Sequence, residues 1–276
     1  MSSRLAARFA ALKREGRAGF VAYVMAGDPD AETALAILSG LPGAGADLIE
    51  VGFPFSDPMA EGPPVQRAAQ RALAAGTTLS GVLDLVRRFR AGDEATPIVL
   101  MGYLNVLLTY GLGAFARDAA AAGVDAAIVV DCPPEEADPL ADALDAAGVA
   151  LVRLATPTSD DARLAVIARR TAGFIYYVSV AGVTGVKAVD TAGVGPAVER
   201  IRRATGLPVA VGFGIRTPEQ AGAVAKVADA VVVGSALVDE VAAALEANEN
   251  VTTRVLATAA RLAQAVRASG RERVQA

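Results

Sequence analysis

Short apolar segments alternate along this chain with longer segments in which apolar residues recur every three or four positions. The short segments predict buried strands, and the longer segments predict amphipathic helices. Strands are expected at 19–25, 48–51, 97–101, 126–130, 149–154, 174–178, 208–212 and 230–234. Helices are expected at 31–41, 64–75, 79–89, 113–122 and 194–203, from 133, after 158–161 and from 217.

Strands and helices follow one another about eight times, without a linker or a change in composition. Such regular alternation predicts an α/β fold, a single (β/α)8 TIM barrel that spans residues 1–276 as one domain. A doubly wound open sheet is the alternative. It is weaker because no Gly-x-Gly-x-x-Gly motif follows the first strand.

Both ends of the chain add helices to this barrel. Leu5, Phe9 and Leu12 have helical spacing, which predicts an extra N-terminal helix within residues 1–17, capped by Ser2 or Ser3. The alternative interpretation of this segment is a transit peptide. The helix is favoured, and a cytoplasmic protein is therefore expected. Residues 239–276 predict a C-terminal helical region, in which residues 248–250 allow a break.

The composition narrows the chemistry that the chain can carry. Its 276 residues suit an α/β barrel, and its net charge of −4 does not suggest a nucleic-acid surface. No apolar run approaches the roughly 20 residues that cross a membrane. The lone cysteine, Cys132, excludes an internal disulfide and a cysteine-rich metal site. Because there is no histidine, catalysis is left to carboxylates, tyrosines, lysines or backbone groups.

One carboxylate stands inside an apolar strand. Glu50 lies between Ile49 and Val51, where an ionised carboxylate is costly unless another group pairs with it. A second carboxylate, Glu61, follows in a loop rich in Gly and Pro. Two carboxylates in unlike environments can divide acid and base work between them. The alternative is that Glu50 pairs with a buried arginine.

Several other polar side chains are expected at the same rim of the barrel. TIM-barrel enzymes place their sites at the C-terminal ends of the strands. The residues near these ends are Tyr23, Glu50, Tyr103, Asn105, Asp131 and Tyr176. Each also has an ordinary explanation, because tyrosine is often a core residue and Asp131 could cap a helix. Their gathering at one rim favours a site.

Three glycine-rich turns follow the last three strands, at 182–185, 212–214 and 234–235. Turns after the seventh and eighth strands form the usual phosphate site of these barrels, because backbone N–H groups and a helix N-terminus face the anion there. Ser235 adds a hydroxyl donor. The alternative is that these glycines only permit tight turns.

A long motif, at the end of the second predicted strand and in the loop after it, resembles that of a known family. The stretch EVGFPFSDPMAEGP at 50–63 resembles the signature of the tryptophan synthase α subunit. The stretches AGDP at 26–29, PIVLMGY at 97–103, DCPP at 131–134, AGVTG at 181–185, VGFGI at 211–215 and VGS at 233–235 are also similar to that family. The resemblance extends from about residue 20 to residue 238.

The resemblance implies an aldolase-like lyase that cleaves indole-3-glycerol phosphate to indole and glyceraldehyde 3-phosphate. In such an enzyme Glu50 would protonate the indole ring and later accept a proton from the glyceryl hydroxyl, while Tyr176 positions it. Tyr23 and Leu100 would line the indole pocket, and Tyr103 and Asp131 are expected to contact the substrate. The resemblance also implies that Thr184 lies on a mobile loop that closes the site. The residues that it implies for binding the substrate phosphate are Gly185, Gly214, Gly234 and Ser235.

One departure from the family motif concerns the second catalytic carboxylate, which is an aspartate in the family and Glu61 here. The added methylene moves the carboxylate by about an ångström, and a shift of that size can cost about 100-fold in rate. A weakened lyase, or one whose loop has readjusted, is therefore a hypothesis.

The resemblance also implies an α2β2 complex with a β subunit that carries pyridoxal phosphate, while the α subunit binds no cofactor and no metal. Positions matching the interface are Pro54, Asp57, Pro58 and Asn105, which could also be simple loop residues. Other functions remain open: another phosphate-binding barrel such as an isomerase, a stand-alone lyase that releases indole, or a non-catalytic activator of the β subunit.

Overall fold

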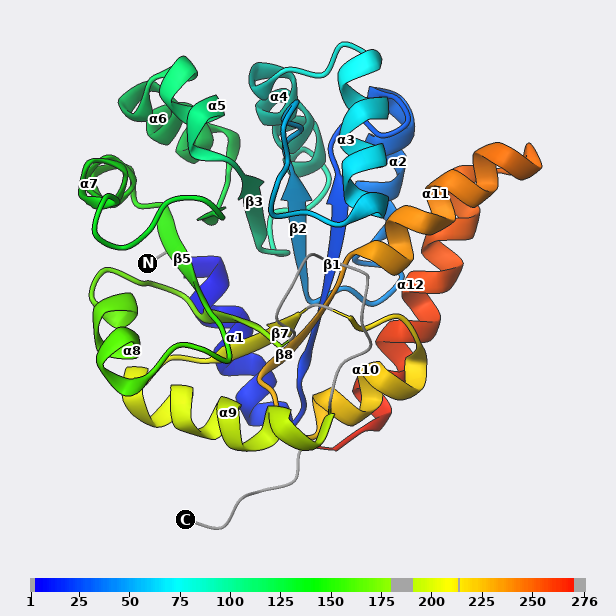
Figure 1. The fold of residues 1–276 in the computed structure, drawn as a ribbon. Helices are drawn as coiled ribbons and strands as arrows, with labels where there is room; N and C mark the ends of the chain where they lie inside the picture. The colour runs from blue at the N-terminus through cyan, green and yellow to red at the C-terminus, as the bar shows by residue number, and fades with distance from the viewer. Residues whose placement is uncertain (1–2, 180–190, 213, 271–276) are drawn as a thin grey trace.

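The computed structural model describes residues 3–179, 191–212 and 214–270. In this part of the chain, eight parallel strands form a closed barrel in sequence order, and β8 closes it by pairing with β1 (Figure 1). The strands are β1 (Gly19–Met25), β2 (Leu48–Gly52), β3 (Ile98–Gly102), β4 (Ala126–Val129), β5 (Ala150–Ala155), β6 (Ile175–Val178), β7 (Val209–Gly212) and β8 (Ala230–Val233). The predicted (β/α)8 TIM barrel is confirmed.

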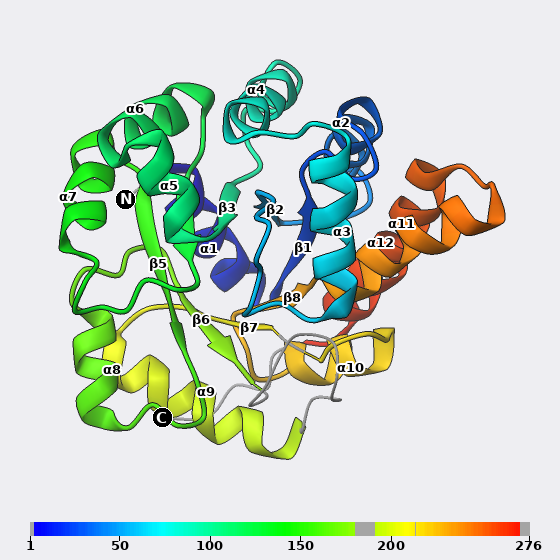
Figure 2. The same cartoon turned by 45° about the horizontal axis from the view of Figure 1, so that its top comes forward.

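Helices surround the strands, as the two ribbon views show (Figures 1 and 2). Those in the described residues are α1 (Ser3–Glu15), α2 (Ala31–Gly40), α3 (Pro63–Ala74), α4 (Leu79–Arg90), α5 (Leu104–Tyr110), α6 (Leu112–Ala122), α7 (Asp138–Ala147), α8 (Asp161–Ala168), α9 (Thr191–Thr205), α10 (Pro218–Ala225), α11 (Ser235–Ala247) and α12 (Val251–Ala268). Over the described ranges, none of them is both long and apolar enough to cross a bilayer.

The N-terminal helix α1 belongs to the core of the molecule. Leu5, Phe9 and Leu12 are buried among the side chains of the barrel interior, and the Phe9 ring lies 5.6 Å from the ring of Phe174 at the start of β6. This confirms the predicted extra helix, with bounds 3–15 within the expected 1–17. Its apolar stripe closes the end of the barrel where the strands begin.

The two faces of each strand contact different parts of the core. In β3, Val99 and Met101 belong to the cluster inside the barrel, whereas Ile98 and Leu100 pack with the helices outside. Side chains alternate along a strand, so both faces are apolar when helices cover the sheet. In β2, Leu48 belongs to the inner cluster, and Glu50 two residues later is therefore on the inner face.

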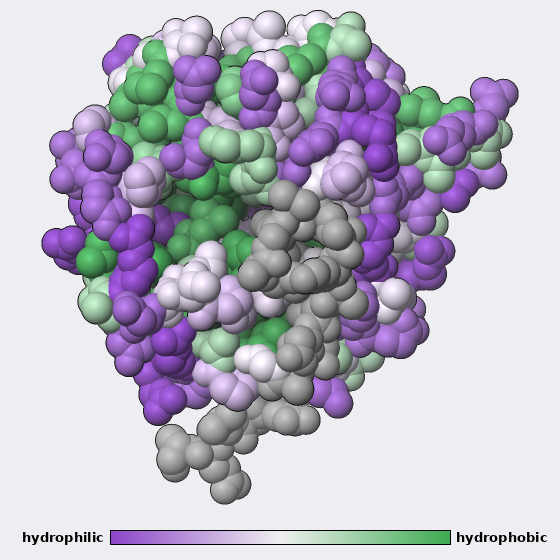
Figure 3. All heavy atoms as spheres, viewed as in Figure 1, coloured by the Kyte–Doolittle hydropathy of each residue, from purple (hydrophilic) through white to green (hydrophobic). Residues whose placement is uncertain are grey.

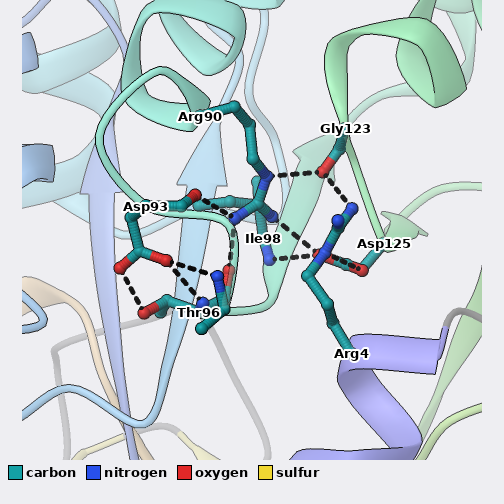
Figure 4. A network of polar contacts seen from close by, with 8 residues as sticks. Arg4, Arg90, Asp93, Thr96, Ile98, Gly123 and Asp125 are labelled. Atoms are coloured by element: carbon teal, nitrogen blue, oxygen red, sulfur yellow. Dashed lines mark hydrogen bonds and ion pairs between the residues drawn. The ribbon is translucent and has the colours of Figure 1, made fainter.

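A polar network fastens α1 to the starts of β3 and β4 (Figure 4). The buried carboxylate of Asp125 accepts from Arg4 Nε and Arg90 Nη2, each at 2.9 Å, and from the Ile98 N–H at 2.8 Å. Arg4 and Arg90 also both donate to the carbonyl of Gly123. The network therefore stabilises the end of the barrel where β3 and β4 begin, opposite to the strand C-termini.

Two helix predictions need correction. The helix expected from residue 133 begins only at Asp138, because 133–136 forms a turn in which the Glu136 N–H donates to the Pro133 carbonyl. The short helix α5 was not predicted at all. The break allowed at 248–250 is confirmed: Asn248 ends α11 in the left-handed region with φ 55°, and Asn250 caps α12.

Candidate active site

The C-terminal ends of the strands surround a cavity, here called the central cavity. Its lining comes from five strands, β1, β2, β3, β6 and β8, and from the segments that follow β2, β7 and β8. The lining residues are Tyr23, Glu50, Glu61, Val65, Met101, Tyr176, Gly214, Ile215, Arg216, Val232, Gly234 and Ser235. Seven of the residues predicted from the sequence therefore meet in one place. Figure 3 shows hydrophobic residues in a hollow on one face of the molecule.

Glu50 is the most deeply buried acid of the central cavity, with 1% of its surface exposed. Its backbone lies between Tyr23 of β1 and Val99 of β3 in the sheet register. Burial, and then the nearby charge of Glu61, raise the pKa of Glu50 to about 8. Within the described ranges no arginine pairs with Glu50, and its Oε2 has no hydrogen-bond partner. The carboxyl is therefore protonated at neutral pH and can donate a proton.

Glu61 is also buried and lines the central cavity from the loop between β2 and α3, where backbone contacts fix its position. Its N–H donates to the Pro58 carbonyl at 3.0 Å, and Gln66 Nε2 donates to its carbonyl at 2.8 Å. The next residue back, Ala60, donates its N–H to the hydroxyl of Tyr103 at 3.0 Å. The loop thus presents the carboxylate to the cavity from a braced backbone.

Tyr103 has this bracing role instead of lining the central cavity. Its ring is buried and lies 5.2 Å from the ring of Phe55, on the same loop as Glu61. Burial, and then the charge of Glu61, raise the pKa of its hydroxyl, so the hydroxyl stays neutral. The structure thus gives Tyr103 a contact that holds the loop, and its contact with a substrate stays a prediction.

Two tyrosine hydroxyls of the central cavity lie where a neighbouring strand has glycine. A Cβ added to Gly212 would sit 2.1 Å from Tyr176 Oη, and one added to Gly52 would sit 2.3 Å from Tyr23 Oη. The glycines thus leave the room that these rings occupy. Burial is the largest cause of the raised pKa of both tyrosines, and the charges of Glu50 and Glu61 add to it. Both hydroxyls remain protonated donors.

The other end of the central cavity suits an anion. Helix α10 has its N-terminus satisfied by a capping box between Thr217 and Gln220, whereas no side chain caps α11, which begins at Ser235. Gly234 and Ser235 at this helix N-terminus both line the cavity, and the free N–H groups of a helix N-terminus attract anions. Gly214 has φ 75°, a left-handed conformation that favours glycine.

Arg216 was missed by the sequence analysis. It lines the central cavity beside Gly214, and its guanidinium forms an ion pair with Asp239. The signal was available, because a positive residue follows directly on the Gly-Phe-Gly-Ile turn at 212–215. A cation at that place adds to the attraction for a phosphate.

Two residues predicted to contact the substrate do not line the central cavity. Leu100 faces the helices, and its neighbour Met101 lines the central cavity instead, because adjacent residues of a strand point to opposite faces. Asp131 does not reach the central cavity; its carboxylate accepts from the N–H of Leu104, the first residue of α5, at 2.8 Å. The predicted contacts Thr184 and Gly185 lie outside the described residues.

The residues predicted for a partner interface differ in exposure. Asp57 and Asn105 are exposed, Pro58 is partly exposed and Pro54 is buried. Two large apolar side chains near them were missed, namely Met59, 74% exposed, and Leu108, 56% exposed. Exposed apolar side chains beside polar residues are typical of a contact surface. As for metals, the described residues contain no cluster of three or more metal-binding side chains.

Comparison with known proteins agrees with this arrangement. The family model described as tryptophan synthase alpha chain matches residues 9–267. The tryptophan synthase alpha chain of Phenylobacterium zucineum is 74% identical over 98% of this chain and 97% of its own length, and that of Caulobacter vibrioides is 70% identical over 96% and 97%. The crystal structure of the alpha subunit from Legionella pneumophila superposes with a TM-score of 0.90 at 39% identity, covering 96% of this chain and 98% of that one. The chain belongs to the tryptophan synthase alpha chain family, the lyases that cleave indole-3-glycerol phosphate.

Proposed function

We propose that Glu50 is the acid and base of indole-3-glycerol phosphate cleavage in this chain. The observation that carries the proposal is a buried carboxyl in the central cavity with a pKa of about 8. The protonated carboxyl donates its proton to C3 of the indole ring, which makes that carbon tetrahedral. The resulting carboxylate accepts the proton of the adjacent glyceryl hydroxyl while the C–C bond breaks. The bonding pair returns to the ring, and the products are neutral indole and an aldehyde.

Glu61 has the complementary role in this proposal. When C3 is protonated, the indole nitrogen becomes positively charged and its N–H becomes acidic. A carboxylate that accepts a hydrogen bond from this N–H stabilises the intermediate through charge. Glu61 lies in the same cavity as Glu50, and Tyr103 and Gln66 brace its loop.

The substrate phosphate is proposed to bind at the α11 end of the central cavity. Gly214, Gly234 and Ser235 supply backbone and hydroxyl donors there, and Arg216 supplies positive charge. Tyr23 and Met101 line the apolar part, and the Tyr176 hydroxyl would keep Glu50 in place. Thr184 and Gly185 stay predictions for the closing loop and the phosphate.

The alpha chains of this family work with a β subunit. We propose an α2β2 assembly in which the pyridoxal phosphate belongs to the β subunit and this chain binds no cofactor. The contact surface would include Asp57, Pro58 and Asn105, with Met59 and Leu108 as its apolar part. Residues 1–276 are proposed to form a single domain, since α1 closes the barrel and α12 packs against α10, α11 and β1. A cytoplasmic location stays a prediction.

The test measures indole release from indole-3-glycerol phosphate, with and without a β subunit. Turnover by this chain alone that rises when the β subunit is added supports the proposed function. Stimulation of the β subunit by a chain with no turnover of its own would favour the alternative, a non-catalytic activator, which no observation made so far supports. Glu50→Gln is the matched control, because it keeps the size of the side chain and removes the transferable proton.

A further inference from the structure

A second cavity, here called the side cavity, lies between the ends of β4 and β5 and helix α7. Its volume is about 270 Å³. Most of its lining is apolar, including Val129, Leu140 and Leu151, and it shares no lining residue with the central cavity. Ligand pockets of proteins occupy about 300–1,000 Å³, so the side cavity suits a compact ligand.

A buried arginine lines the side cavity. Arg153 stands in β5 between Val152 and Leu154 and is only 7% exposed. Its Nε has no hydrogen-bond partner, and no ion pair or hydrogen bond in the described part of the chain holds its guanidinium. A buried charge without a partner lowers the stability of the fold. Compensation by a bound anion would remove this cost.

The acids around Arg153 already have other partners. Glu135 forms an ion pair with Arg163, and Asp138 lies 3.6 Å from Arg170. Asp131 accepts from the Leu104 N–H. The surrounding carboxylates thus leave Arg153 unpaired, yet they also oppose the approach of a doubly charged anion. A single negative charge on an apolar body matches both the guanidinium and the apolar lining.

We propose that the side cavity binds a compact monocarboxylate, with its carboxylate on Arg153 and its apolar part against Val129, Leu140 and Leu151. The site is separate from the central cavity and is not needed for the lyase reaction. The chain carries its own reporter for this site, because its only cysteine, Cys132, is half-buried in the wall of the same cavity.

The experiment follows alkylation of Cys132 by N-ethylmaleimide at pH 8.5, using the full chain and two probes of the same shape. Phenylacetate is expected to slow alkylation at least fivefold at saturation, whereas neutral phenylacetamide should not. Arg153→Met should abolish the protection, and Arg170→Met, a nearby arginine on the surface, should leave it unchanged. Arg153→Met is also expected to keep indole release and to melt no lower than the native chain, so a loss of protection cannot be ascribed to unfolding.

Three results would overturn the proposal. The first is equal protection by phenylacetate and phenylacetamide, which would mean an apolar hollow without an anion site. The second is unchanged protection in Arg153→Met. The third is complete protection of Cys132 by the β subunit alone, with no further effect of phenylacetate. Because Arg153 and Cys132 line the same cavity, this result would mean that the partner chain covers Arg153. Protection by phenylacetate that persists in the complex supports the proposal.

Discussion

Glu50 and Glu61 face one cavity, and the charge of Glu61 adds to the effect of burial in keeping the Glu50 carboxyl protonated. The two acids are held by different elements of the fold. Glu50 is held by the middle of a barrel strand, whereas Glu61 is held by a loop that contacts Tyr103. A rigid proton donor and a charged acceptor on a separate element can therefore act on two different atoms of the same substrate.

Replacing Glu50 by glutamine should remove the proton donor and leave the shape of the cavity unchanged. Indole release is expected to fall by about 100- to 10,000-fold, the usual contribution of a general acid. In the native chain, kcat/KM should decrease as the pH rises through about 8, because the protonated form is lost. Steady-state kinetics of the native chain and of Glu50→Gln between pH 6 and pH 9.5 measures the fall in rate and the pH dependence of kcat/KM. A native profile that stays flat across this range would contradict the proposed role.

The same carboxyl should make the stability of the fold depend on pH. The pKa of Glu50 is about 8 in the folded chain and near the ordinary glutamate value of 4.5 in the unfolded chain. The unfolded chain therefore releases this proton first, and stability is lost as the pH rises from about 4.5 to about 8. Glu50→Gln should remove this loss, which is on the order of a few kcal/mol. Urea unfolding of the native chain and of Glu50→Gln at pH 5.5 and pH 8.5 measures this loss of stability. The same difference in unfolding free energy between the two chains at both pH values would count against the prediction.

Glu61→Gln separates the charge of this residue from its size. Without that charge the pKa of Glu50 should fall, so the alkaline limb of the rate profile moves to lower pH. The loss of charge stabilisation should also lower kcat/KM about 100-fold. The hypothesis that Glu61 weakens the lyase is tested by a second substitution. If it is right, Glu61→Asp should raise kcat/KM, and an unchanged value would reject it.

Gly212→Ala tests the placement of the Tyr176 hydroxyl. The new Cβ would sit 2.1 Å from Tyr176 Oη, so the ring must move away from its present position. Overpacking of this kind costs about 1–3 kcal/mol of stability. If Tyr176 positions Glu50 as proposed, kcat should also fall more than KM rises. Gly113→Ala, in helix α6 with only ordinary contacts, is the control that should keep full activity. Equal effects of the two substitutions would disprove the positioning role.

Arg216→Gln tests the anion end of the central cavity. Removing this charge should raise KM for indole-3-glycerol phosphate about tenfold while kcat changes little, as expected when binding is weakened equally in the ground and transition states. Arg88→Gln removes an exposed arginine that pairs with Glu32 outside the cavity, and it should change neither constant. If Arg216→Gln behaves like Arg88→Gln, the cation is not part of the phosphate site.

The sequence predicted the order of the strands because each is an apolar run followed by turn residues. It did not distinguish the two faces of a strand, since β3 is apolar on both. The pattern therefore did not oppose Leu100, the pocket residue that the family resemblance implied, although Met101 lines the cavity. Pro133 and Pro134 are typical of a first helical turn, yet here they form a separate turn. Arg153 gave no functional signal, because only the folded neighbours reveal that its guanidinium lacks a partner.

Because the pKa of Glu50 is raised, this chain has an unusual set of groups that titrate near neutral pH. It has no histidine, and burial raises the pKa of its only thiol above the ordinary value of 9. Apart from the amino terminus, the usual groups that exchange protons between pH 7 and pH 9 are thus missing, and Glu50 is a carboxyl that takes their place. At a pH near 8, where a phosphate monoester is already doubly ionised, a change in bound protons on substrate binding would therefore report mainly on Glu50 in the barrel interior, where the ring is to be protonated.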